Sequence, residues 1–189
     1  MLEHDEIPGQ EELYQIAKEM NHSRNSALFV LTYLTGARIS EVLKRVKKKN
    51  IKIRKMRGKD YIVIERLYTA KRKKHPLRNQ VIPIHKEMFL WKIVQDYADT
   101  LKPDDILFPI SYQRSWQILS KVISKYKEKS TTNKFMNACH YLRHCRNTHL
   151  VTIYDFNDQD LVKFNAWSDS KPATTYVHLR SLDIARKFD

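Results

Sequence analysis

Residues 51–84 read IKIRKMRGKDYIVIERLYTAKRKKHPLRNQVIPI, and their pattern differs from that of the rest of the chain. Apolar and basic residues alternate in Ile51–Arg54, Arg57–Asp60 has the composition of a turn, and Tyr61–Leu67 is rich in β-branched and aromatic residues. Gln80–Ile84 has the pattern of a third short strand. This stretch therefore predicts a small antiparallel sheet.

Helical patterns flank this stretch on both sides. Three helices are expected before it, at Glu11–Arg24, Ala27–Leu34 and Ser40–Val46. Five are expected after it, at Lys86–Leu101, Ser111–Tyr126, Phe135–Ile153, Gln159–Phe164 and Thr174–Lys187. The sequence therefore predicts a mainly α fold with a small three-stranded antiparallel β-sheet (α+β), in one domain over residues 1–189.

Local signals refine the helix ends and the core. Gly36, after the apolar segment, predicts a left-handed cap, and Ser40 is expected to be the N-cap of the short helix that follows. The residues expected in the core of the two helices after the sheet are Met88, Leu90, Trp91, Val94, Tyr97, Trp116, Leu119, Val122 and Ile123.

Composition excludes several classes of protein. The 189 residues are 42% hydrophobic, and no apolar run approaches the roughly 20 residues of a membrane-spanning helix. Two cysteines are too few for a disulfide scaffold, and three glycines are too few for a phosphate-binding loop. We therefore expect a soluble protein of the cytoplasm, or of the host cytoplasm if a virus or plasmid encodes it, with no membrane partner and no cofactor.

The surplus of positive charge is the strongest global signal. The chain has 35 Lys and Arg against 21 Asp and Glu, a net charge of +14, and residues 44–59 contain no acid. Such a surplus predicts a polyanionic partner, most often nucleic acid, whereas a solvated basic face and a basic membrane-surface helix are the alternatives. The side chains expected to contact DNA are Lys47, Lys48, Lys49, Arg72, Lys73 and Lys74.

Two histidines have the spacing of metal ligands but lack the rest of a site. His140 and His144 are four residues apart on one expected helix, yet Tyr141 stands where a metalloprotease helix carries its glutamate. No third ligand is evident, so no metal site is predicted. Cys139 and Cys145 are expected to be buried or inert.

Several short strings occur in the order found in a known family. Thr35–Leu43 (TGARISEVL) resembles the TGxRxSEL segment of the tyrosine recombinases, the phage integrase family. His140–His144 (HYLRH) resembles the HxLRH box of that family, Ala166-Trp167 its Gly-His/Trp element, and Thr175-Tyr176 its closing tyrosine. The resemblance extends from about residue 11 to residue 187 and implies the catalytic-domain fold of a tyrosine recombinase.

The resemblance also implies a set of catalytic residues. Arg38 and Arg143 would grip one phosphate, because a guanidinium can donate two parallel hydrogen bonds to it. Tyr176 would attack the phosphorus and form a 3′-phosphotyrosyl link. His140 would assist proton transfer on the tyrosine side, and Trp167 would donate its indole N–H to the phosphate or pack the site.

Two further roles follow from the same resemblance. The family carries a lysine on a β-hairpin as the general acid for the leaving 5′-oxygen, and Lys71 matches it best. Lys73 and Lys74 stand beside it, and hairpin register leaves the choice among the three open. Glu41 is expected to support Arg38.

The chain departs from the family pattern at three places. Ala166 replaces the usual glycine before the tryptophan, and Phe156-Asn157 replaces a loop glycine, with Asn157 expected to adopt the left-handed turn. The DNA-clamping domain that family members commonly carry before the catalytic domain is expected to be absent from this chain. These departures indicate a divergent member with a complete catalytic set.

The expected function is that of a site-specific recombinase or integrase. It would cleave and rejoin double-stranded DNA without a metal, as four protomers on two DNA sites. The alternatives are a DNA-relaxing enzyme like the type IB topoisomerases and a non-catalytic DNA-binding protein with the same fold. Tyr141 and Tyr154 compete with Tyr176 for the role of nucleophile.

Overall fold

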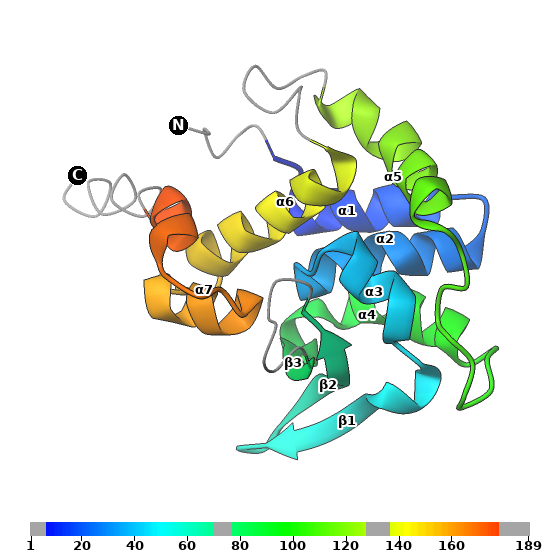
Figure 1. The fold of residues 1–189 in the computed structure, drawn as a ribbon, viewed down its shortest axis with the longest axis horizontal. Coiled ribbons are helices and arrows are strands. Elements are labelled where there is room, and N and C mark those ends of the chain that lie inside the picture. The colour runs from blue at the N-terminus through cyan, green and yellow to red at the C-terminus, as the bar shows by residue number, and fades with distance from the viewer. Residues whose placement is uncertain (1–6, 70–76, 128–136, 178–189) are drawn as a thin grey trace.

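The structure is a computed structural model that describes residues 7–69, 77–127 and 137–177. Figure 1 shows the helices gathered over a small sheet, with α7 beside the end of α6. Within the described ranges, no helix has both the length and the apolar character that crossing a membrane requires.

The order of elements matches the expected fold class. The helices before the sheet are α1 (Gln10–Lys18), α2 (Ser23–Thr35), α3 (Ile39–Arg45) and the short 3₁₀ helix η2 (Lys48–Asn50). The strands β1 (Ile51–Met56), β2 (Lys59–Tyr68) and β3 (Leu77–Pro83) pair antiparallel in the order β1-β2-β3. The later helices are α4 (Ile84–Ala98), α5 (Tyr112–Lys127), α6 (Ala138–Thr152) and α7 (Asp158–Asn165), and residues 171–177 are also helical. The predicted mainly α fold with a small three-stranded antiparallel sheet is confirmed.

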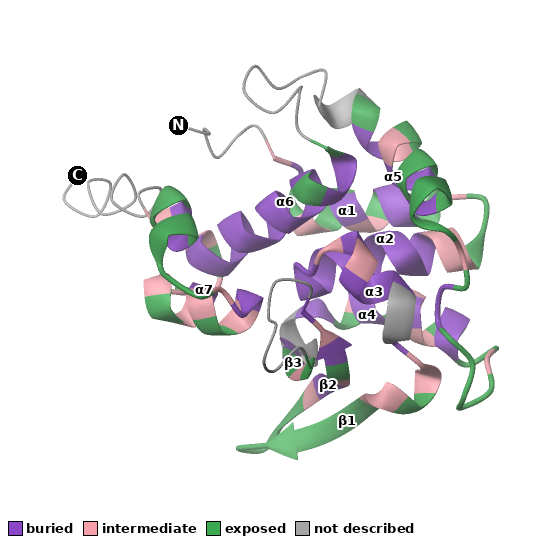
Figure 2. Ribbon diagram, in the orientation of Figure 1, coloured by how far each residue is buried: buried purple, intermediate pink, exposed green. Residues whose placement is uncertain are grey.

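The sheet turns one face toward the helices. Ile62 on β2 lies opposite Ile53 on β1 and Ile82 on β3, and directly opposed residues share a face. Ile62 and Ile82 are buried, whereas Ile53 is 61% exposed. The helices therefore cover β2 and β3 but leave β1 in solvent, as Figure 2 shows.

Helix α2 is the centre of the larger core. Its residues from Ser26 to Thr35 are all buried, because α1, α3, α4 and α6 pack around it. The helix ends at Gly36, whose φ of 55° gives the left-handed cap expected from the sequence. The chain can therefore turn sharply toward Arg38.

Two expected helix boundaries are wrong. Glu11–Arg24 is not one helix, because α1 ends at Lys18 and α2 begins at Ser23. His22 between them has an extended backbone, and its carbonyl accepts the first N–H groups of α2. The last expected helix, Thr174–Lys187, begins earlier, at Lys171, and its part after Val177 lies outside the described residues.

Ser40 is not the N-cap of α3, because the helix begins at Ile39 and Arg38 occupies the cap position. The Glu41 carboxylate accepts a hydrogen bond from the Arg38 backbone N–H at 3.0 Å. The Arg38 carbonyl in turn accepts the N–H groups of Glu41 (2.8 Å) and Val42 (3.2 Å), so the first turn of the helix closes on Arg38, two residues before the predicted cap.

Two aromatic or sulfur side chains expected in the core are exposed. Met88 is 52% exposed, because Glu87 before it leaves helical geometry (φ −131°) and turns its own carboxylate inward. Trp116 is 42% exposed, because the buried side of α5 runs through Ser115 and Leu119 instead. The other expected core residues are buried or half-buried: Leu90, Trp91, Val94, Tyr97, Leu119, Val122 and Ile123.

The apolar side chains form two separate clusters. The larger one joins α1–α6 to the sheet. The smaller one contains Leu150 and Val151 at the end of α6, Leu161 on α7, and Ala173 and Tyr176 on the last helical turns. The segment that carries Tyr176 therefore packs on α6 rather than on the main core.

A buried ion pair ties α6 to the main core. The Arg146 and Glu87 side chains are both 0% exposed, and Arg146 Nη2 donates to Glu87 Oε2 at 3.1 Å while Nη1 donates to Oε1. Gln10 on α1 donates to the same carboxylate at 2.8 Å and to the Tyr154 hydroxyl at 3.1 Å. The guanidinium also lies 5.4 Å from the ring centre of Tyr33. This network joins α1, α2, α4 and α6.

Glu87→Gln should lower the free energy of unfolding by about 3–5 kcal/mol, because it leaves a buried arginine without its counter-charge. Urea unfolding at pH 7 measures the change. Asp96→Asn is the matched control, since it removes a carboxylate from the exposed 2.5 Å pair with Lys92 and should cost less than about 1 kcal/mol. Equal losses in the two variants would contradict the role given to the buried pair.

Candidate active site

Helix α6 places several expected site residues on neighbouring turns. It begins at Ala138, where the Asn137 side chain caps it by accepting the Cys139 N–H at 2.9 Å. Arg143 and His144 are each 4% exposed, whereas His140, one turn earlier, is exposed. The helix thus presents one buried cation, one buried imidazole and one exposed imidazole.

Arg143 reaches across to the turn after α2. Its Nη1 donates to the Gly36 carbonyl at 2.6 Å, a carbonyl that the left-handed backbone of Gly36 leaves outside the helix. Its Nη2 is buried and, within the described part of the chain, has no hydrogen-bond partner. Burial, and after it the charge of Arg38, lower the pKa of Arg143 to about 10. The group is charged at neutral pH and keeps an unused donor.

Arg38 lies on the other side of that turn. Its Nη1 contacts Glu41 Oε1 at 3.0 Å, and its side chain is 32% exposed while that of Glu41 is 1% exposed. The buried Glu41 carboxylate therefore binds one N–H group of the Arg38 guanidinium, and the other N–H groups remain open to solvent. Arg38 and Arg143 lie close enough for their like charges to interact, which favours an anion between them.

Trp167 stacks between a cation and an aromatic ring. The Arg143 Cζ lies 5.4 Å from the centre of its ring, and the Tyr176 ring lies nearly parallel at 6.3 Å and 14°. Ala166, which caps α7, has a φ of 53°, and the Trp167 N–H donates to Val162 O at 3.0 Å. An alanine here adopts the left-handed turn for which glycine is the favoured residue.

The expected left-handed turn at Asn157 is wrong. Asn157 has a φ of −92° and is the N-cap of α7, with its side chain accepting the Asp160 N–H at 3.0 Å. Asp155 has the positive φ in this loop, at 59°. The capping bond requires an extended backbone at Asn157, so the loop reverses two residues earlier.

Tyr176 is 8% exposed and its hydroxyl lies 3.3 Å from His144 Nδ1. Burial raises the pKa of Tyr176, and the Asn147 amide and the Arg143 charge oppose that rise only in part. The phenol is therefore protonated at neutral pH. Burial, and after it the neighbouring His140, lower the pKa of His144 to about 4, so His144 is neutral under the same conditions.

His140 lies within electrostatic reach of both arginines. Partial desolvation of its ring, followed by the charges of Arg143 and Arg38, lowers its pKa. In the structure, His144 rather than His140 forms the hydrogen bond with the Tyr176 hydroxyl. The assignment of proton transfer to His140 stays a prediction.

The basic residues predicted to contact DNA or to act as the general acid fall into two groups. Lys71, Arg72, Lys73 and Lys74 lie outside the described residues. The other three are in ion pairs with acids between α4 and α5: Lys47 with Asp104 (3.3 Å), Lys48 with Asp99 (3.4 Å) and Lys49 with Asp104 (2.5 Å).

Sequence reasoning overlooked two residues at the tyrosine. Neither His144 nor Asn147 was predicted to have a role at Tyr176. His144 follows His140 by four residues on α6 and Asn147 follows Arg143 by four, and this helical spacing from two predicted site residues was the available signal. Across the described ranges, no group of three or more His, Cys, Asp or Glu residues could hold a metal ion.

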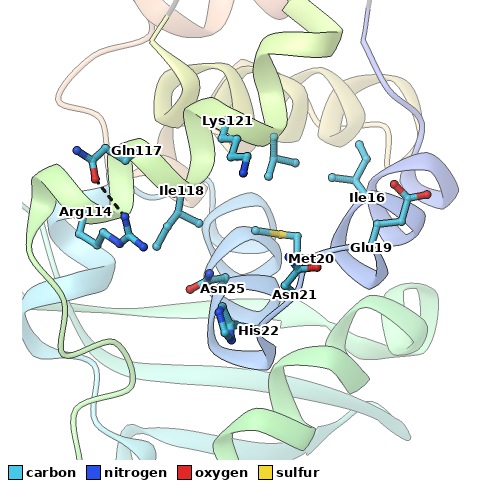
Figure 3. A pocket seen from close by; sticks show the side chains of 11 residues that line it. Ile16, Glu19, Met20, Asn21, His22, Asn25, Arg114, Gln117, Ile118 and Lys121 are labelled. Atoms are coloured by element: carbon cyan, nitrogen blue, oxygen red, sulfur yellow. Dashed lines mark hydrogen bonds between the residues drawn. The ribbon is translucent and has the colours of Figure 1, made fainter.

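A separate cavity of about 650 Å³ lies between the α1–α2 connection and α5, and Figure 3 shows its walls. Ile16, Met20 and Ile118 supply apolar walls, and His22 and Arg114 lie among its polar residues. None of the expected site residues lines it. The candidate site is instead the surface formed by the turn after α2, the middle of α6 and the residues after α7.

Comparisons with known proteins agree on one family and one fold. The model of the phage integrase family matches residues 1–182. No match is found among the curated proteins. The solved structures matched include the XerH site-specific recombinase bound to difH substrate before cleavage (TM-score 0.65, 18% identity, 100% of this chain, 52% of that one).

Two further solved structures have the same fold. The XerH complex with palindromic difH after cleavage gives a TM-score of 0.67 at 18% identity, over 98% of this chain and 52% of that one. The XerA recombinase gives 0.60 at 18% identity, over 99% of this chain and 63% of that one. The chain spans about half the length of the XerH chains.

Sulfate should raise the melting temperature of the wild-type chain above that in sodium chloride of equal ionic strength, because an oxyanion relieves the repulsion between Arg38 and Arg143. Arg38→Gln should lose most of this rise, as measured by differential scanning fluorimetry. Arg114→Gln, on the exposed side of α5, should keep it. An equal rise in Arg38→Gln and wild type would place the anion elsewhere.

Proposed function

The chain belongs to the phage integrase family, and from this premise we propose that it is the catalytic domain of a site-specific DNA recombinase. It cleaves and rejoins duplex DNA through a 3′-phosphotyrosyl intermediate and uses no metal. The observation that carries this proposal is the stack of Arg143, Trp167 and Tyr176. In this stack the proposed nucleophile lies close to a buried guanidinium whose Nη2 has no hydrogen-bond partner among the described residues, which supports the proposal.

The two arginines bind the scissile phosphate. Arg38 offers its solvent-facing N–H groups, and Arg143 offers Nη2, which has no partner within residues 7–69, 77–127 and 137–177, so the phosphate lies between two positive charges. Their attraction for it increases as negative charge gathers on the non-bridging oxygens in the transition state. The hydrogen bond to Glu41 holds Arg38 in position, so the guanidinium does not have to reorient during the reaction.

The chemical step exchanges one phosphodiester bond for another. A bond forms between Tyr176 Oη and phosphorus while the bond from phosphorus to the 5′-oxygen breaks. The phenol proton passes to a neutral histidine, the role that the family resemblance gives to His140. The departing 5′-oxygen takes a proton from a hairpin lysine, for which Lys71 is the best match in sequence. Rejoining reverses these transfers.

Duplex DNA is the proposed partner, and the β1–β2 hairpin is the surface that suits it. Residues opposite each other across the hairpin share a face, which puts Lys52, Arg54 and Lys59 on one outer row. Arg54 contacts Glu65 at 2.7 Å, whereas Lys52 and Lys59 form no ion pair with any carboxylate in the described ranges. Lys52 on β1 and Lys59 on β2 are both exposed and are available for phosphate contacts, and Figure 2 shows β1 coloured as exposed.

The pairing of Lys47, Lys48 and Lys49 changes their expected contribution. Each would have to leave Asp99 or Asp104 before contacting a phosphate, which reduces the net gain. The XerH structures are complexes with difH substrate, which supports a DNA partner by family analogy. We extend the analogy to four protomers acting on two DNA sites, in the cytoplasm.

Tyr176→Phe should abolish the covalent DNA adduct while leaving DNA affinity nearly unchanged, because only the nucleophilic oxygen is removed. A pool of nicked suicide duplexes, read as a protease-sensitive band on a denaturing gel, measures this. Tyr154→Phe removes a competing tyrosine and should keep the adduct. Salt-sensitive binding by wild type without any adduct would favour the non-catalytic DNA-binding alternative.

Lys52→Gln/Lys59→Gln should reduce the slope of log affinity against log salt by about 1–2, because each lost phosphate contact accounts for about 0.9. Fluorescence anisotropy with a labelled duplex over a salt series gives the slope. Lys47→Gln/Lys49→Gln removes the same charge from lysines held by Asp104 and should change the slope less. Equal changes would show that net charge, and not this surface, governs binding.

A further inference from the structure

We infer that His144 is a positioning residue that holds the hydroxyl of Tyr176 in its reactive orientation, an inference that rests on the proposed role of Tyr176 as nucleophile. The family resemblance gave His144 no role. The contact that carries the inference is the 3.3 Å approach of His144 Nδ1 to Tyr176 Oη, with the ring centres 5.2 Å apart.

The phenol is fixed on two sides. Trp167 lies parallel to its ring, and His144 meets its hydroxyl from α6. Trp167 restrains the plane of the ring, and the hydrogen bond restrains the direction of the O–H. With the proton directed at Nδ1, the remaining lone pairs of Oη point away from His144. Arg143, adjacent to His144 on the same helix, then lies on the side where a phosphate would bind.

His144 makes this contact at a cost that packing alone does not explain. The side chain is 4% exposed, and within the described residues its Nε2 has no hydrogen-bond partner. A buried polar atom without a partner is destabilising. An aliphatic side chain would fill this space without that cost, so the bond with Tyr176 is the feature that an imidazole adds here.

The charge state of His144 suits an orienting bond. Burial, and after it the neighbouring His140, lower the pKa of His144, so its ring is neutral at neutral pH. A neutral ring that carries its hydrogen on Nε2 can accept a hydrogen bond from the Tyr176 hydroxyl at Nδ1. So weak a base leaves the proton on Tyr176 until the phosphate arrives. The O–H then turns from His144 toward His140, to which the proposed function assigns the proton transfer.

The test compares two substitutions of His144 that differ only in hydrogen bonding. His144→Leu removes the acceptor and should slow single-turnover adduct formation about 10–100-fold, the range expected for one lost bond to a reacting oxygen. His144→Asn keeps an acceptor near the Nδ1 position and should remain within about 5-fold of wild type. DNA affinity should be unchanged in both.

His149→Leu is a matched control on the same helix. His149 is also buried, and its Nδ1 lies 2.7 Å from the Tyr33 hydroxyl, so the variant removes an equivalent bond that does not involve the nucleophile. It should lower the melting temperature yet leave the rate of adduct formation per folded molecule within about 3-fold. A His144→Leu rate no lower than that of His149→Leu, or a His144→Asn rate as low as that of His144→Leu, would overturn the inference.

A DNA-independent measurement separates this inference from the proposed function. With 3-fluorotyrosine incorporated, the fluorine signal of Tyr176 is assigned by its loss in Tyr176→Phe. The signal should shift in His144→Leu and stay in place in His149→Leu. An unmoved signal in His144→Leu would exclude the contact. A wild-type chain that forms no adduct would contradict the proposed function, while the fluorine shift would still decide whether His144 holds the hydroxyl.

Discussion

The position of α6 depends on the ion pair between Arg146 and Glu87. Both side chains are completely buried, and a charge removed from water is tolerated only beside its partner and with its hydrogen bonds satisfied. Glu87 leaves helical geometry to reach the guanidinium, and Gln10 and Tyr33 complete the surroundings. Because α1, α2 and α4 all contribute to this contact, it fixes how deeply α6 packs into the core and how the helix is rotated about its axis.

That fixed rotation determines the geometry of the candidate site. Arg143 and His144, within one turn of Arg146, face the turn at Gly36 and the Tyr176 segment respectively. Two left-handed residues, Gly36 and Ala166, redirect the chain so that distant segments meet α6. The smaller apolar cluster, which is separate from the larger one, carries Tyr176 against the end of α6. Trp167 packs against this cluster and also contacts Arg143, so the cluster links the Tyr176 segment to that arginine.

Surface charge shows why a count of basic residues is an incomplete guide to a DNA-binding surface. The run of lysines at 47–49 is the densest in the described chain, yet each of these lysines forms an ion pair with Asp99 or Asp104. These acids lie about 50 residues away in sequence, so the residues around the run do not predict the ion pairs. On the β1–β2 hairpin, in contrast, the strand alternation itself places Lys52 and Lys59 on one open face.

The fold class, the three strands, the left-handed cap at Gly36 and most of the core could be predicted from the residues alone, because these follow from short-range periodicity and backbone preference. The sequence also named Arg38, Glu41, Arg143, Trp167 and Tyr176, which the structure brings together. The kink at Glu87, the exposure of Met88 and Trp116, and the contact between His144 and Tyr176 are visible only in the folded chain. Each depends on a partner that lies outside the local pattern or must be folded into place, and a buried charge or hydroxyl takes whichever partner the packing of the whole chain supplies.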